Sequence, residues 1–169
     1  MKKDKEILRK LKSSNEKLIS ETIIELRDTG HVGYLDDIFK AYQKGFNEET
    51  KTIYAKFISD IKSKDASNYI ANFISDLTDE NDIALYTSSC WQSSLDFANN
   101  INLFTDLFIK YNYQVAIEAF TVIENCMHNI DQELIKDQID KLKKSLSTIQ
   151  EEKKLLMAEL IKVFQSFLI

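Results

Sequence analysis

The sequence contains no proline, and glycine occurs only at Gly30, Gly33 and Gly45. A β-sandwich or β-barrel of this length needs many tight turns, and such turns depend on glycine and proline. Helices need these two residues only at their ends. The scarcity of both residues therefore predicts an all-α chain.

Cysteine and long apolar runs are also scarce. The two cysteines, Cys90 and Cys126, are too few for a disulfide framework, so we expect reduced thiols and a cytoplasmic location. The N-terminal MKKDKEILRKLK is followed by no continuous apolar stretch, which argues against a signal peptide. The apolar stretch after residue 154 contains Glu159 and Lys162 and is too short to cross a bilayer, so no membrane partner is expected.

Negative charge outnumbers positive charge in the middle of the chain. Residues 18–130 contain eight Lys or Arg against seventeen Asp or Glu, whereas residues 1–17 contain seven against three. Residues 131–169 are balanced at seven against seven. An acidic body repels phosphate, so nucleic acid is not expected as a partner. The basic N-terminal stretch is interpreted as the solvated face of a helix.

Apolar residues recur at helical spacing almost throughout the chain, and the pattern itself repeats at an offset of about 35 residues. The repeated positions are Leu35, Ile38, Phe39 and Tyr42, then Ile70, Phe73, Ile74 and Leu77, then Phe104, Leu107, Phe108 and Tyr111. Helix pairs at such a period bury their apolar faces by stacking on their neighbours. Residues 1–130 are therefore predicted to form a right-handed array of about four antiparallel helix pairs.

Three segments carry a resemblance to a known family. ELRDTGHVGYLDDIFKAY, FISDIKSKDASNYIANFISDL and SSLDFANNINLFTDLFIKY resemble HEAT-like helical repeats over residues 14–128. The resemblance implies an α-solenoid scaffold that binds other proteins, and it implies no particular partner. HEAT-type repeats usually carry a proline in the first helix, which this chain lacks. A tetratricopeptide-like or unclassified array of helix pairs thus remains the alternative.

Residues 131–169 show a heptad pattern, in which apolar positions alternate spacings of four and three residues. The seam is Ile135, Ile139, Leu142, Leu146, Ile149, Lys153, Leu156, Leu160, Val163 and Phe167. The pattern predicts one long helix, with Lys153 as the only polar interruption and a place for register control. Such an apolar face must be covered. Either the helix caps the array, or a second copy pairs with it through Ile135, Ile139, Leu142, Leu146 and Ile149.

Ser89-Cys90-Trp91 resembles the core of the papain-type cysteine signature. That family places its histidine base well over a hundred residues downstream, whereas only 79 residues follow Cys90, and His128 is the sole later histidine. Cys90 is therefore predicted to be a small apolar residue of the core. Cys126 and His128 are two residues apart and point to different sides of a helix, so neither a metal site nor another cofactor is expected.

The helix predicted over residues 115–127 is apolar around most of its circumference, with one polar stripe. We take the stripe and its neighbours as candidate binding residues: Trp91, Gln92, Glu118, Thr121 and Glu124. Four tyrosines near helix ends are interpreted either as core residues or as contact aromatics: Tyr34, Tyr42, Tyr69 and Tyr86. The sequence favours a non-catalytic cytosolic protein-interaction scaffold. The alternative is a small-ligand-binding protein or an enzyme with its site near Trp91 and Glu118.

Overall fold

The computed structural model describes residues 3–29, 32–43 and 45–168, and every regular element within those ranges is a helix. The prediction of an all-α chain is confirmed for these residues. The helices are α1 (Lys5–Leu11), α2 (Glu16–Thr29), α3 (Leu35–Ala41), α4 (Glu48–Asp60), α5 (Ala66–Ser75), α6 (Glu80–Gln92), α7 (Ile101–Lys110), α8 (Tyr113–Cys126), α9 (Gln132–Ser145) and α10 (Lys154–Ser166). Short 3₁₀ turns lie at Val32–Tyr34, Ala98–Asn100, Met127–Asn129 and Glu151–Lys153.

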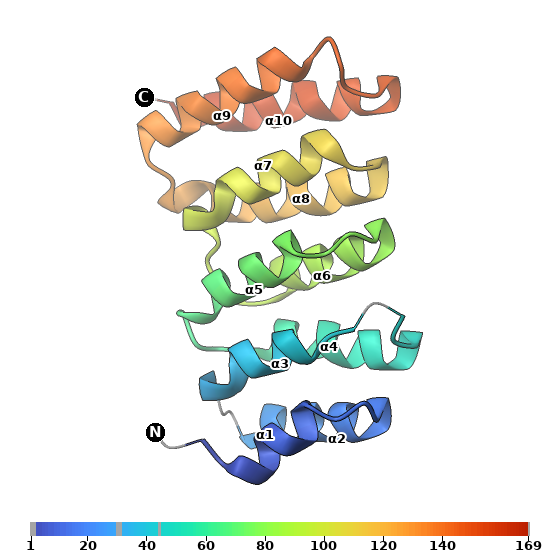
Figure 1. Cartoon of the computed structure of the whole chain (residues 1–169). Coiled ribbons are helices and arrows are strands. Elements are labelled where there is room, and N and C mark those ends of the chain that lie inside the picture. The colour runs from blue at the N-terminus through green and yellow to red at the C-terminus, as the bar shows by residue number, and fades with distance from the viewer. Residues whose placement is uncertain (1–2, 30–31, 44, 169) are drawn as a thin grey trace.

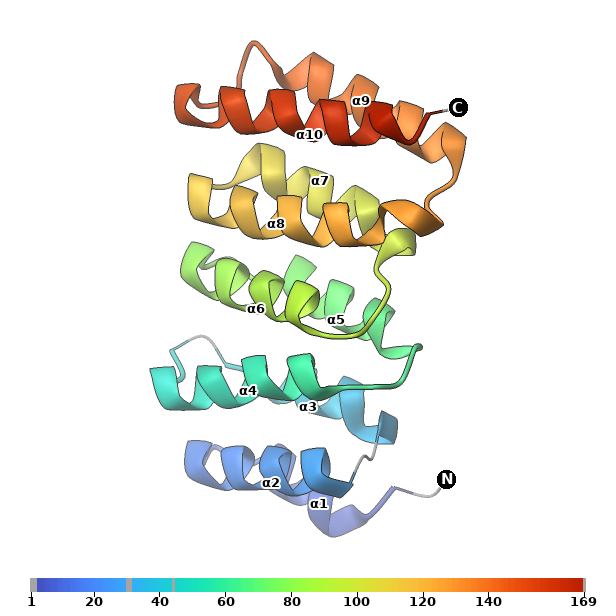
Figure 2. The ribbon, with the colours of Figure 1, turned by 180° about the vertical axis from the view of Figure 1, so that it is seen from behind.

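The helices lie in two layers, with odd-numbered helices in one and even-numbered helices in the other (Figure 1, Figure 2). In the even layer, α2 packs on α4, α4 on α6, α6 on α8 and α8 on α10. In the odd layer, α1 packs on α3, α3 on α5 and α7 on α9. Contacts between α1 and α2, α7 and α8, and α9 and α10 join the two layers. The chain thus advances along one axis, one odd and one even helix at a time.

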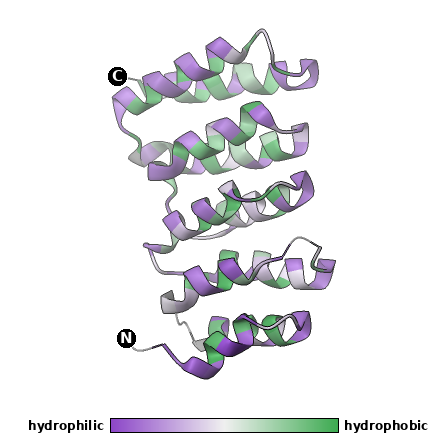
Figure 3. Ribbon diagram, in the orientation of Figure 1, coloured by the Kyte–Doolittle hydropathy of each residue, from purple (hydrophilic) through white to green (hydrophobic). Residues whose placement is uncertain are grey.

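Apolar side chains between the layers form the core. Nine of the twelve positions in the repeated apolar pattern are buried, and the other three, Tyr42, Leu77 and Tyr111, are partly buried. These three follow the last residues of α3, α5 and α7. The twelve positions therefore lie in α3, α5 and α7 or within two residues of their ends, on the side that packs into the core. Figure 3 shows hydrophilic and hydrophobic residues alternating along the helices, as expected when one face is buried.

The N-terminal ends of α2, α4, α6 and α8 repeat more regularly than the apolar pattern. Asn47 Oδ1 accepts from the Thr50 amide at 2.9 Å, and Asn112 Oδ1 accepts from the Val115 amide at 3.0 Å. The side chains of Asn15 and Asp79 accept amide hydrogens of α2 and α6 in the same way. These caps recur every 32 or 33 residues. Each satisfies an amide that has no partner within its helix and fixes where that helix begins.

The single long helix predicted for residues 131–169 is wrong, because α9 ends at Ser145 and α10 begins at Lys154. Between them, Ser145 Oγ donates to the Leu142 carbonyl at 2.8 Å and Thr148 Oγ1 donates to the Ser145 carbonyl at 3.1 Å. Hydroxyl side chains that bind nearby carbonyls compete with the helical pattern. The heptad spacing continues across this interruption, although the helix does not.

Four of the five predicted self-association residues lie in the chain's own core. Ile135, Ile139, Leu142 and Ile149 are buried, whereas Leu146 is 43% exposed. α9 packs on α7, and α10 packs on α8 and α9, so the apolar face of this segment is covered by the array. Pairing with a second copy through the four buried residues would require this segment to leave that position, whereas Leu146 is already accessible.

Candidate protein-binding groove

The structure joins two of the five candidate binding residues. Trp91 of α6 donates its Nε1 hydrogen to Glu118 Oε2 of α8 at 2.7 Å. Thr121 Oγ1 donates to the Ile117 carbonyl at 3.0 Å, while Gln92 and Glu124 are exposed. The cavity beside Trp91 has a volume of only about 30 Å³. A cavity of that size holds about one water molecule.

Both cysteines are buried, and the prediction that Cys90 belongs to the core is confirmed. Its Sγ donates to the Tyr86 carbonyl at 3.4 Å. Burial raises the pKa of the Cys90 thiol well above its ordinary value, and burial also raises the pKa of Cys126 to about 11. Neutral thiols are poor nucleophiles and poor metal ligands. Within the described ranges, no group of three or more His, Cys, Asp or Glu side chains is arranged to hold a metal.

A larger hollow lies between α3 and α5, with a volume of about 430 Å³. We call it the α3–α5 groove. It is lined by Asp36, Phe39, Lys40, Tyr42, Tyr69, Asn72, Phe73, Asp76, Leu77, Thr78, Asp79 and Asp82. The lining therefore comes from α3, from α5, from the turn after α5 and from the first turn of α6. Segments up to 46 residues apart in the sequence meet around one cavity.

Aromatic rings form the floor of the α3–α5 groove. The rings of Phe39 and Phe73 are stacked, with centroids 4.8 Å apart, and both side chains are buried. Tyr42 meets Phe73 edge to face at 5.3 Å and Tyr54 at 5.4 Å. Tyr69 lies at the rim and is 46% exposed. Two of the tyrosines singled out in the sequence therefore line the cavity, Tyr42 in the packed floor and Tyr69 on the open side.

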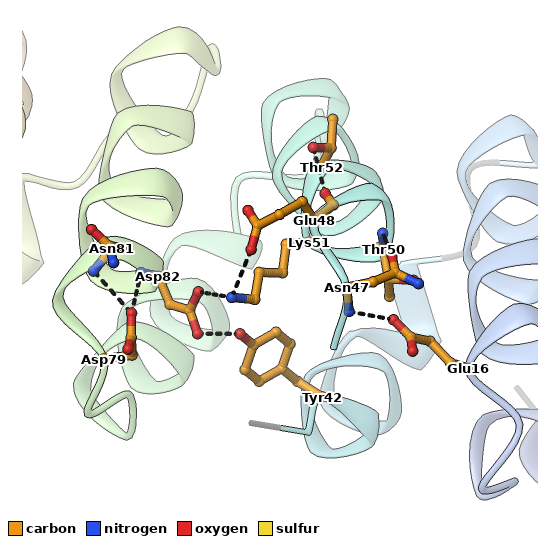
Figure 4. Close-up of polar contacts among 10 residues, drawn as sticks. All are labelled: Glu16, Tyr42, Asn47, Glu48, Thr50, Lys51, Thr52, Asp79, Asn81 and Asp82. Atoms are coloured by element: carbon orange, nitrogen blue, oxygen red, sulfur yellow. Dashed lines mark hydrogen bonds and ion pairs between the residues drawn. The ribbon is translucent and has the colours of Figure 1, made fainter. Parts of the chain in front are cut away.

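Asp82 is the buried charge of the α3–α5 groove, at 3% exposure. Lys51 Nζ lies 2.8 Å from Asp82 Oδ1, and the Tyr42 hydroxyl donates to Asp82 Oδ2 at 2.5 Å (Figure 4). The bond to Asp82 raises the pKa of Lys51, whereas burial, reinforced by that carboxylate, raises the pKa of Tyr42. This arrangement neutralises Asp82 and joins α4 and α6 to the residue that follows α3. Its role is structural.

The rim of the groove is acidic. Asp36 pairs with Lys40 of the same helix at 2.7 Å. Asp79 Oδ1 accepts the amide hydrogens of Asn81 and Asp82 at 3.0 and 3.3 Å, so it caps α6. Asp76 is exposed at the C-cap of α5. The groove is therefore most negative where α5 ends and α6 begins.

Lys153 is a second buried charge, far from the groove and 1% exposed. Its Nζ donates to the carbonyls of Phe108 and Ile109 at 2.9 Å and to that of Tyr111 at 2.6 Å. Burial lowers the pKa of this ammonium group. The expected register role of Lys153 in a heptad seam is replaced by a cap on the carboxyl end of α7.

The sequence singles out Tyr42 and Tyr69 as core residues or contact aromatics, but it predicts neither the groove nor the aspartates that line it. The acidic run at residues 79–82 predicts a favourable start for a helix, which is correct for Asp79, but it does not predict a cavity. A usable signal is the density of carboxylates at positions 76, 79, 80 and 82, directly after a helix with exposed and buried aromatics. No helix in the described part of the chain has both the length and the apolarity needed to span a bilayer. No protein-family model, curated protein or solved structure matches the chain.

Proposed function

We propose that this chain is a non-catalytic, cytosolic protein-interaction scaffold, a HEAT-like α-solenoid of antiparallel helix pairs that holds a segment of another protein in the α3–α5 groove. The observation that carries the proposal is the groove itself, a cavity of about 430 Å³ with an aromatic floor and a polar rim. Binding surfaces of proteins combine an apolar, aromatic centre with a polar edge in this way.

The polar groups of the groove suit binding better than catalysis. Its one buried carboxylate, Asp82, already has a cation and a hydroxyl as partners. No histidine or cysteine is among the residues that line it. A general base needs a titratable group free to exchange a proton with substrate. The groove therefore offers contact area and charge, which are the requirements of recognition.

The dimensions of the groove fit a short stretch of polypeptide. α5 has ten residues, so this wall is about 15 Å long at the helical rise of 1.5 Å per residue. An extended chain advances about 3.3 Å per residue, and the groove therefore accommodates roughly five residues of an extended segment.

A display selection tests the proposal without a known partner. Random peptides are selected on the intact chain, and the enriched sequences are then tested on two tryptophan variants. Asn72→Trp fills the α3–α5 groove from α5, whereas Gln165→Trp adds the same bulk to an exposed position on α10. We expect the enriched peptides to bind the wild type and the Gln165→Trp variant and to lose most of their affinity for Asn72→Trp. Equal binding to both variants would place recognition outside the groove.

A further inference from the structure

The charge of the α3–α5 groove identifies the chemistry of its occupant, an inference that rests on the function proposed above. Four aspartates line the groove against one lysine. We propose that the bound segment is basic, with a lysine or arginine side chain placed against Asp76 and Asp79 where α5 ends. Charge complementarity of this kind determines partner choice and speeds association.

The position of Asp76 supports a cationic occupant. The last turn of a helix carries partial negative charge from unpaired carbonyls, and cations are favoured there. Asp76 is the C-cap residue of α5, and the last turn of α5 contains no basic side chain. A carboxylate at this point adds negative charge to a negative helix end, which is unfavourable for the free protein. A cation from a partner interacts favourably with both.

Two of the aspartates that line the groove already have a cationic partner. The available negative charge therefore lies where α5 ends. Asp82 is paired with Lys51, and Asp36 is paired with Lys40. Among the described residues, no lysine or arginine lies within ion-pair distance of Asp76. Asp79 accepts two amide hydrogens through a single oxygen, Oδ1, and retains its negative charge. The charge without a positive counterpart is therefore greatest at Asp76, because the N-terminus of α6 already favours the carboxylate of Asp79.

The aromatic residues distinguish a basic side chain from a simple metal cation. Tyr69 exposes nearly half of its surface at the rim, and Phe39 and Phe73 form an apolar floor. Lysine and arginine lay an aliphatic stem along apolar surface and keep the charged group at its edge. A guanidinium group also stacks on tyrosine. The combination of acidic rim and aromatic floor matches both parts of such a side chain.

Three fluorescent peptides of about five residues, the length that the groove accommodates, test this chemistry on the intact chain. One carries three arginines, the second carries citrulline at the same positions, and the third carries glutamate. Citrulline keeps the shape of arginine and removes its charge. We expect the arginine peptide to bind at least about tenfold more tightly than the citrulline peptide, and to weaken as salt screens the charges. Equal or tighter binding of the citrulline or glutamate peptide would overturn the inference.

Charge-matched variants separate the groove from general attraction to an acidic protein. Asp76→Lys and Asp140→Lys change the net charge equally, but Asp140 is exposed on α9, away from the groove. We expect the first to lower arginine-peptide affinity at least about tenfold and the second less than about twofold. Tyr69→Ala should weaken binding more than Tyr113→Ala, which removes a similarly exposed tyrosine from α8. Equal losses in either pair would overturn the inference.

Stability gives a readout that does not require a partner. Asp76→Asn removes the unfavourable charge at the end of α5, so it should raise the melting temperature by about 1–3 °C while weakening the arginine peptide. A lowered melting temperature would show that Asp76 is a structural residue and would overturn its assignment. If the display selection yields groove-dependent peptides without basic residues, the scaffold function stands and only the basic chemistry fails. If neither arginine peptides nor displayed peptides bind the groove, both proposals fail.

Discussion

The ammonium group of Lys153 lies 2.6 Å from the carbonyl oxygen of Tyr111, 42 residues earlier in the chain. It also donates to Phe108 and Ile109, so its three hydrogens meet three carbonyls at the end of α7. These carbonyls have no amide partner within their helix. One side chain from the turn before α10 therefore closes a helix of the preceding pair. These three hydrogen bonds connect the turn before α10 to α7, in addition to the apolar packing between neighbouring helices.

Replacing Lys153 with methionine tests this cap. Methionine keeps the apolar stem, but it leaves three carbonyls without a donor, and unsatisfied buried acceptors cost about 1–3 kcal/mol. We expect the free energy of unfolding to fall by about 2 kcal/mol, measured by urea denaturation. Lys154→Met is the control, because its exposed pair with Glu151 contributes little. Equal stability of the two variants would show that the bonds of Lys153 contribute nothing.

Asp82→Asn tests the bonds of Asp82 to Lys51 and Tyr42 beneath the α3–α5 groove. The change preserves shape and leaves Glu48, at 3.2 Å, as the anionic partner of Lys51, so breaking the buried pair with Asp82 should cost up to about 3 kcal/mol. Asp36→Asn breaks an exposed pair and is expected to change stability by less than about 1 kcal/mol. Thermal and urea unfolding measure both. Similar losses in the two variants would mean that burial adds nothing to the Asp82 pair.

The sequence predicts the features of this structure that depend on local patterns of apolar residues. Helical periodicity identifies the buried positions of the odd layer, because each apolar stripe must face the other layer. The heptad seam over 135–167 is misleading, since a period records which face is apolar and does not record where the backbone turns. The side chains of Ser145 and Thr148 bind nearby carbonyls at the break, but bonds of the same kind occur inside α2 and α6, so they do not by themselves end α9.

The candidate site is harder to predict, because the groove depends on how two helices are placed. Tyr69 and Asp76 are seven residues apart, and helical geometry puts them near one face of α5. Nothing in the sequence shows that Asp36 and Lys40 of α3 lie across from that face. Trp91 and Glu118 do lie together, because α6 and α8 pack directly on each other. The volume of the cavity beside them depends on how the helices pack and cannot be predicted from the sequence pattern, and it is small.

Alkaline pH should destabilise the protein. Burial raises the pKa values of Cys90, Tyr54 and Tyr86, and it raises that of Cys126 from 9.0 to about 11. The unfolded chain releases these protons at ordinary values of 9.0 for thiols and 10.0 for phenols, whereas the folded protein keeps them. The folded state then binds more protons, so stability falls as pH rises above about 9. The lowered pKa of Lys153 has the opposite effect on stability as pH rises, but it involves only one group.

Urea unfolding at about pH 8 and about pH 10.5 measures this effect. Each group whose pKa is raised contributes up to about 1.4 kcal/mol per pH unit within its window. The midpoint should move to lower urea at the higher pH. Cys126→Ala removes one of the contributing groups and should reduce the shift. A midpoint that does not move between the two pH values would contradict the buried, neutral state of these side chains.

Variants of two leucines of α10 distinguish packing within the chain from pairing with a second copy. Leu160 is fully buried, whereas Leu155 is 82% exposed on the same helix. Leu160→Asp places a charge in the core and should lower the free energy of unfolding by about 4 kcal/mol. Leu155→Asp should leave stability within about 0.5 kcal/mol of the wild type. Light scattering measures the oligomeric state of both variants. If the wild type is a dimer that Leu155→Asp converts to stable monomers, α10 contacts a second copy through its exposed side; an unchanged oligomeric state restricts the role of α10 to covering α8 and α9.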